Sequence, residues 1–316
     1  QCVNNLKQIG LAAHNFESSN NKFPDGQGPV PKVSGAAGTG FIRGSVLTMI
    51  LPYLEQASLY ATFNLDLDVQ SHMENETARC LQVAAFVCPS DASGSRMTGG
   101  SGQQFGTNSY YGSIGATAGQ LFNTPAGTAE TDNSRLGIFN IQMNLTGTLA
   151  TNPDFRKVMS SVTIASISDG TSNTALFSET KRSRLPSMSS TPVVLTDRDI
   201  VHRSQGWTTP AGNYIPPDDC DTSTYSPLNY RGLQYYRATQ FLHVYSHTVP
   251  PNYKGFDCSD ATAGAAHIAA RSYHSGGVNV GMADGSVRFV KDAVNLNTWR
   301  ALGTRAAGEV ISADSL

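Results

Sequence analysis

The chain has 316 residues, of which 39% are hydrophobic and 15% are charged. The apolar content suffices for a large core, whereas the charged fraction lies well below the roughly 25% of an ordinary soluble domain. Lysine and arginine number 22 against 24 aspartates and glutamates, which gives a net charge of -2, and no basic cluster occurs. This excludes the electrostatic signature of a nucleic-acid-binding protein, so we expect no nucleic-acid partner.

Low charge, 30 glycines and 15 prolines indicate a turn-rich β protein of exported type. The sequence has no run of 18 apolar residues, so we expect contact with a membrane only through a segment preceding Gln1. It also starts inside a helical pattern and without an initiator methionine. We therefore expect that an anchoring or targeting segment has been removed.

Apolar residues near the start recur at steps of three and four, namely at Val3, Leu6, Ile9, Ala13 and Phe16. This spacing predicts an amphipathic helix over residues 1–18. We expect the stripe from Leu6 to Phe16 to be buried against a sheet, with the opposite face free for neighbouring subunits. Leu6→Asp should then unfold or loosen the domain, whereas Asn5→Asp should leave it folded.

The next segments predict a second helix and then a sheet. A helical pattern with Pro52 near its first turn covers residues 45–63. Short apolar runs at 83–88, 161–167 and 174–179 predict the strands of a first set of sheet segments between residues 80 and 179. The part from 180 to 260 holds most of the prolines and many tyrosines without periodicity. We expect it to be a loop-rich insertion in one domain that spans 1–316.

A β-hairpin is the clearest local prediction near the end of the chain. Alternating β runs at 278–283 and 286–290 flank Asp284 and Gly285, a pair that favours a type I′ turn. A short apolar pattern at 292–302 predicts a closing helix after the hairpin. Residues 272–302 are therefore expected to form a C-terminal hairpin with its helix.

His274 and Asp284 lie at opposite ends of the first strand of this hairpin, which would separate them by roughly 20 Å. They are then too far apart to share a proton or a metal ion. We expect a structural role for both, with His274 bonded to a backbone group and Asp284 stabilising its own turn. His274→Ala should change stability or assembly and not turnover of a substrate.

The five cysteines are too widely spread for a CxxC site, which favours disulfides and an oxidising compartment. Glycosylation sequons at Asn75 and Asn144 are typical of the same environment. We predict a Cys220–Cys258 disulfide across the irregular insertion, worth roughly 3 to 4 kcal/mol. Cys80 with Cys88 is the second predicted pair, and Cys2 with Cys88 is its alternative.

Two groups of side chains offer metal ligands. Asp218, Asp219 and Asp221 could coordinate Ca²⁺, although their spacing matches no EF-hand and a solvated acidic loop is the favoured interpretation. His243 and His247 would share one face of a helix and could bind Zn²⁺, but the aromatic residues around them favour a packed segment. We expect no other cofactor.

Known catalytic motifs are missing from the sequence. It has no GxSxG elbow, no phosphate-binding loop, no GxGxxG after a strand and no HExxH. Scattered Ser, His and Asp residues could still meet in space. We expect a protein that is not an enzyme.

Several segments together resemble one family. Residues 1–16 (QCVNNLKQIGLAAHNF) resemble the stretch that follows the hydrophobic prepilin helix in a large family of pilin-like proteins abundant in planctomycete-type bacteria. The run from His274 to Asp284 and Gly285 is similar to the H-x9-D-G motif that names the family's prepilin-type processing-associated domain. Internal blocks in the same order are LPYLEQ at 51–56, VCPSD at 87–91, SDGTSNT at 168–174, PPN at 250–252 and the tail WRALGTR at 299–305.

This resemblance implies an α+β, pilin-like fold in which an N-terminal helix packs on an antiparallel sheet. It also implies a leader, a cleavage site and an apolar helix before Gln1. We therefore expect a non-enzymatic structural subunit of the cell envelope or surface, of the pilin or pseudopilin type found in type IV pili and type II secretion. Its expected partners are copies of itself or other pilin-like subunits in a filament.

Two alternatives stay open. One is a secreted or anchored module that binds a glycan or a protein through the tyrosine-rich insertion, and the other is a secreted hydrolase. Exposed rings in the insertion would favour the binding module, and buried rings would favour the structural role. The rings in question belong to Trp207, Tyr214, Tyr225, Tyr230, Tyr235 and Tyr236.

Overall fold

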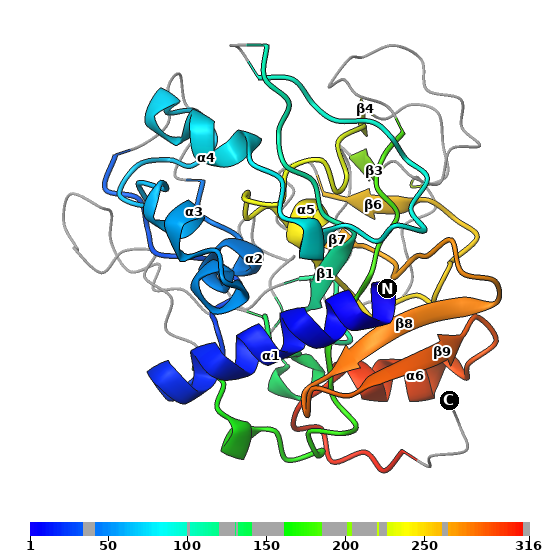
Figure 1. Ribbon diagram of the computed structural model, residues 1–316. Coiled ribbons are helices and arrows are strands. Elements are labelled where there is room, and N and C mark those ends of the chain that lie inside the picture. Colours follow the sequence, from blue (N-terminus) through cyan, green and yellow to red (C-terminus); the bar gives the residue numbers. More distant parts are fainter. Residues whose placement is uncertain are drawn as a thin grey trace.

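The fold is α+β, with helix α1 (Cys2–Asn20) lying across the main sheet (Figure 1). The structure is a computed structural model. It describes residues 1–33, 42–99, 102–119, 130, 132–140, 161–184, 220, 228–260 and 265–311, together with the backbone of 201–203 and 226–227.

The main sheet has five strands in the order β5-β1-β2-β8-β9. Neighbouring strands are antiparallel except for β1 and β5, which are parallel. The prediction of a purely antiparallel sheet is therefore wrong at this edge, where a long connection brings the chain back in the same direction. The strands are β5 (Val244–Tyr245), β1 (Tyr110–Ser113), β2 (Ala175–Glu179), β8 (Gly277–Met282) and β9 (Val287–Lys291).

The β8–β9 hairpin forms as predicted, with Gly281 opposite Val287. Its turn is not of type I′, because only Gly285 has a positive φ, of 83°. The Gly285 N–H donates to the Met282 carbonyl at 3.0 Å, and the Met282 N–H donates to Ser286 at 2.8 Å. This is a type I turn closed by a glycine bulge. Asp284 Oδ1 accepts from the Ser286 N–H at 2.8 Å and so stabilises its own turn, as expected.

Helix α1 buries Leu6, Ile9 and Ala13 and packs against β2, β8 and β9. Phe16 is only half-buried and meets the Tyr53 ring edge-on at 5.7 Å between centroids. Asn5 does not lie on the solvent side as predicted. It is buried, and its Nδ2 donates to the Val87 carbonyl at 2.9 Å.

The helix predicted at 45–63 is divided into three short pieces. Pro52 disfavours a continuous helix, and Glu55 adopts a left-handed conformation with φ 57° that ends the second piece. The apolar runs at 83–88 and 161–167 form 3-10 turns and not strands, because their backbone bonds locally, with the Phe86 N–H donating to the Val83 carbonyl and the Ile167 N–H to the Ile164 carbonyl, both at 3.1 Å. The pieces and turns are α2 (Val46–Met49), η2 (Leu51–Leu54), α3 (Ala57–Ala61), η4 (Ala84–Phe86) and η6 (Ile164–Ser166).

A second sheet of four short strands has the order β4-β3-β6-β7. The segment predicted as a decorated insertion therefore contributes both a sheet and core residues. Tyr230, Tyr235 and Tyr236 are buried, whereas Trp207, Tyr214 and Tyr225 lie outside the described residues. The strands are β4 (Ser226–Leu228), β3 (Val201–Arg203), β6 (Asp257–Ser259) and β7 (Ala266–His267).

The closing helix forms as α6 (Leu296–Gly303), and the Asn295 side chain caps its first turn. None of the helices within the described ranges is both long and apolar enough to cross a bilayer. The remaining short elements are η3 (Met73–Asn75), α4 (Glu76–Cys80), η5 (Asn133–Arg135) and α5 (Gln240–His243).

Candidate functional site

Four residues from distant parts of the chain meet beside the first turn of α1. Cys2 begins that helix, Cys88 follows η4, Glu179 ends β2 and His274 precedes β8. One ligand atom from each lies within 4.8 Å of those of the others. Cys2 and Cys88 form a disulfide, with their Cα atoms 5.0 Å apart.

Glu179 is the centre of this cluster. Its buried carboxylate accepts from His274 Nε2 at 3.0 Å and from the backbone and side chain of Asn279 at 2.8 and 3.1 Å. Burial raises the pKa of this carboxyl group, and the hydrogen bonds from Asn279 and His274 partly oppose that shift. The arrangement holds the end of β2, the start of β8 and the loop before it together.

The prediction that His274 bonds to a backbone group is therefore wrong, since its ring bonds to the Glu179 carboxylate. Asp284 is held by its own turn at the other end of β8 and does not join the cluster. Sequence reasoning missed Glu179 altogether. Its only local signal is an acidic residue at the end of a strand that begins with three apolar residues.

The disulfides correct one predicted pair. Cys220 and Cys258 are bonded, as predicted from the sequence. Cys88 bonds to Cys2 and not to Cys80, because α1 brings Cys2 to the loop after η4. Cys80 ends α4 as a half-buried thiol. Two disulfides fit a protein of an oxidising, extracytoplasmic compartment.

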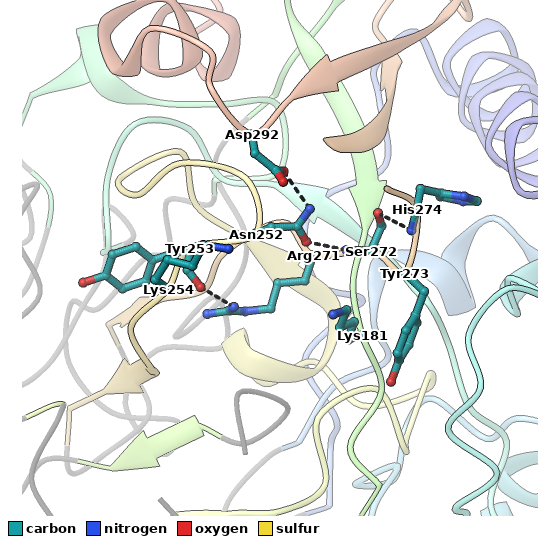
Figure 2. Close-up of a pocket in the computed structure, with 9 residues that line it drawn as sticks. All are labelled: Lys181, Asn252, Tyr253, Lys254, Arg271, Ser272, Tyr273, His274 and Asp292. Atoms are coloured by element: carbon teal, nitrogen blue, oxygen red, sulfur yellow. Dashed lines mark hydrogen bonds between the residues drawn. The ribbon is translucent and has the colours of Figure 1, made fainter. Parts of the chain in front are cut away.

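A pocket of about 530 Å³ adjoins His274 (Figure 2). Its wall is fixed by hydrogen bonds. Asn252 Nδ2 donates to Asp292 at 2.7 Å, and the Ser272 N–H donates to Asn252 Oδ1 at 2.9 Å. Ser272 Oγ donates to the Gly277 carbonyl and accepts from the His274 backbone N–H, so it is not bonded to the imidazole. Ser272 is therefore not a nucleophile activated by His274.

A metal ion would find suitable donors in the cluster only after reduction of its disulfide. Two thiolates, one imidazole and one carboxylate match the ligands that Zn²⁺ prefers, but sulfur bonded to sulfur is not a ligand of this kind. The proposed calcium ligands Asp218, Asp219 and Asp221 lie outside the described residues.

His243 and His247 do not form a zinc pair. Helix α5 ends at His243, so the two rings are not on one helical face. His243 lies 2.9 Å from the carbonyl oxygens of Thr239 and Gly26, whereas His247 Nδ1 donates to Trp299 O at 2.7 Å. Burial lowers the pKa of His243 to about 4 and that of His247 to about 3, as expected for packed neutral rings.

The sequon at Asn75 is also structural. Asn75 is buried, its Oδ1 accepts from the Asn64 N–H at 2.8 Å and its Nδ2 donates to the Asn64 carbonyl at 3.0 Å. A glycan on this nitrogen would require the local fold to open. Asn144, the other sequon, lies outside the described residues.

Comparison with family models shows which family the chain resembles. The model SBP_bac_10, described as a protein of unknown function (DUF1559), matches residues 1–297. The matched region contains the whole cluster and the pocket. Neither the curated proteins nor the solved structures give a match.

Proposed function

The chain belongs to this family of unknown function, and we propose that it is a non-enzymatic structural subunit of the cell envelope or surface, of the pilin or pseudopilin type. The resemblance of residues 1–16 and of the His274–Gly285 segment to pilin-like proteins supports this proposal. The two disulfides are consistent with such a location.

The observation that carries the proposal is the covalent attachment of α1. Its first residue, Cys2, is bonded to Cys88, and Asn5 bonds to the neighbouring Val87. Beside this disulfide, Glu179 and His274 link β2 to the start of β8. A force applied at the N-terminal end of α1 would pass through this disulfide into the segment after η4, where the Phe86 carbonyl accepts from the Ser109 N–H, just before β1, at 2.7 Å. A subunit held in an assembly through its first helix requires this property.

The outer face of α1 is the proposed contact with a second copy of the chain. Val3 is 37% exposed and Leu11 is 60% exposed, whereas Leu6 and Ile9 on the other face are buried. Burial of Tyr235 and Tyr236 also favours a structural role over a module that binds through exposed rings.

Sedimentation velocity of the oxidised protein over a range of concentrations tests this proposal. We expect concentration-dependent association that Leu11→Glu weakens and Met73→Glu does not. Met73 is the matched control, since it is 78% exposed and lies on η3, away from α1. A chain that stays monomeric at every concentration, or equal effects of both variants, would contradict self-association through α1.

A further inference from the structure

The pocket beside His274 has the size and the lining of a small-molecule site. Its volume of about 530 Å³ lies within the range of ligand pockets in proteins. Figure 2 shows Tyr253 and Lys254 on one side of it, Lys181 and Tyr273 on the other, and Arg271 between them. Two aromatic rings and three basic side chains therefore border one space.

Positive charge predominates in this pocket. Lys181, Lys254 and Arg271 line it, against the single carboxylate of Asp292. Lys254 is exposed and makes no ion pair with the described residues. Lys181 Nζ lies 4.5 Å from the centroid of the Tyr273 ring, in a cation–π contact between two residues that line the pocket.

Arg271 adds a buried positive charge to the lining of the pocket. It is buried, and it donates to the backbone carbonyls of Tyr253 and Gly255 at 2.6 and 2.9 Å and to Asp257 at 2.8 Å. Asp257 is also paired with buried Arg231, so two guanidinium groups share this carboxylate. The Nε of Arg271 has no acceptor among the described residues. The floor of the pocket therefore favours an anion.

Asp292 places a hydrogen-bond acceptor on the opposite wall of the pocket. Its Oδ1 accepts from Asn252, and no described residue donates to its Oδ2. A carboxylate oxygen in this position can accept from a hydroxyl group of a ligand. The Tyr273 residue is 38% exposed and Lys181 Nζ lies over one face of its ring, so the apolar face of a sugar ring would pack on the face that Lys181 does not cover.

We propose that this pocket binds a short acidic oligosaccharide. The carboxylate of a uronic acid would lie near Lys254 and Arg271, a hydroxyl group would donate to Asp292, and the sugar ring would pack on Tyr273. Net positive charge excludes a neutral sugar as the preferred ligand, and the aromatic wall favours a ring over a bare anion. The proposal does not depend on assembly through α1.

Isothermal titration calorimetry with digalacturonate tests the site, with lactose as a neutral sugar and inorganic phosphate as an anion without a ring. We expect saturable binding of digalacturonate that weakens as salt is added, and weaker binding of both controls. Lys254→Ala should raise the dissociation constant about tenfold, since it removes one charge-assisted contact. Lys7→Ala, at an exposed lysine on α1, should leave it unchanged.

Three results would overturn the proposal. They are no binding of digalacturonate at millimolar concentration, equal binding of lactose or phosphate, and equal effects of Lys254→Ala and Lys7→Ala. Because Lys254 is exposed, its variant is expected to keep the melting temperature of the parent protein. Sedimentation of the same Lys254→Ala sample separates this test from that of self-association.

Discussion

Two regions of the molecule are stabilised in different ways. The helix–hairpin region, formed by α1, β8 and β9, buries mainly apolar side chains such as Leu6, Ile9 and Val280. The polar-core segment, residues 229–260 and 265–271, buries charged groups and imidazoles beside its aromatic rings. Among its described residues the buried charged groups and imidazoles are Arg231, His243, His247, Asp257, Asp260, His267 and Arg271.

This difference indicates which region of the fold should lose stability when the pH or a charged residue changes. Burial of apolar side chains does not itself depend on pH, whereas a buried charge needs its partner and a buried neutral histidine needs to stay unprotonated. The strands β6 and β7 are only three and two residues long, so they contribute few ladder hydrogen bonds. The Cys220–Cys258 disulfide and the Arg231–Asp257–Arg271 cluster hold this segment instead.

Lowering the pH should cause the largest loss of folding stability, because the polar-core segment buries neutral histidines. Burial lowers the pKa of His243 to about 4 and those of His247 and His267 to about 3. The unfolded chain binds protons at these groups below pH 6.5 and the folded chain does not, so stability falls as the pH falls from 6.5 toward 4. Each histidine contributes about 3 kcal/mol to that loss by pH 4.

Urea unfolding at intervals between pH 7 and pH 4 measures this loss. We expect the midpoint to fall steeply below pH 6.5. His72→Gln serves as a control and should show the same fall of the midpoint as the parent protein. His72 belongs neither to the polar-core segment nor to the contacts of that segment described above. A midpoint that stays level over this range would mean that these three rings are charged or open to water in the folded protein.

Removing the charge of Asp257 should produce the next largest effect. Asp257→Asn leaves Arg231 and Arg271 buried without their shared carboxylate, which costs about 3 to 5 kcal/mol. Asp66→Asn is the matched control, since its side chain is 59% exposed in a surface pair with Lys32 and should cost less than about 1 kcal/mol. Similar unfolding midpoints for both variants would refute a structural role for the buried cluster.

In the helix–hairpin region, Leu6→Ala should destabilise the protein by about 2 to 5 kcal/mol, because it leaves a cavity between α1 and the sheet. Leu11→Ala lies on the same helix but on its exposed face, so its effect should stay within about 0.5 kcal/mol. Thermal melts at pH 7 compare the two. If Leu11→Ala proves the more damaging change, α1 packs against the sheet through its other face.

The smallest effect is expected at the hairpin turn. Gly285 has φ 83°, a conformation that disfavours any residue with a Cβ, although the added atom would meet nothing closer than His14 at 3.8 Å. Gly285→Ala should therefore cost about 1 kcal/mol through backbone strain alone. A chemical denaturation curve resolves this difference. A loss above about 3 kcal/mol would show that the turn also has a packing role.

The sequence was informative where one local pattern determines the structure. Asp284 and Gly285 between two alternating runs predicted the hairpin, and the three-to-four spacing predicted α1, because both depend on residues close in the chain. The turn type was missed because the same dipeptide suits a glycine bulge as well as a type I′ turn. The break at 45–63 depends on Glu55 adopting a left-handed conformation, which no spacing reveals.

The candidate site was only partly predictable, because it joins residues that are far apart in sequence. His274 was identified, but its partner Glu179 lies 95 positions away and has no motif of its own. Cys2 could be chosen over Cys80 as the partner of Cys88 only once the position of α1 was known. The polar-core segment was not predicted as part of the core for a related reason. Its buried charged residues form ion pairs between loops, and such pairs produce no periodic pattern in the sequence.

The half-buried thiol of Cys80 affects how fast the two disulfides can exchange. Burial raises the pKa of this thiol, and nearby Glu76 raises it further. Only the thiolate attacks a disulfide, so a raised pKa keeps the attacking form scarce at neutral pH. The folded chain thus carries a fifth cysteine that is slow to exchange with either bond. Disulfide exchange in the folded protein should therefore be slow at neutral pH and faster at alkaline pH, where the Cys80 thiolate forms.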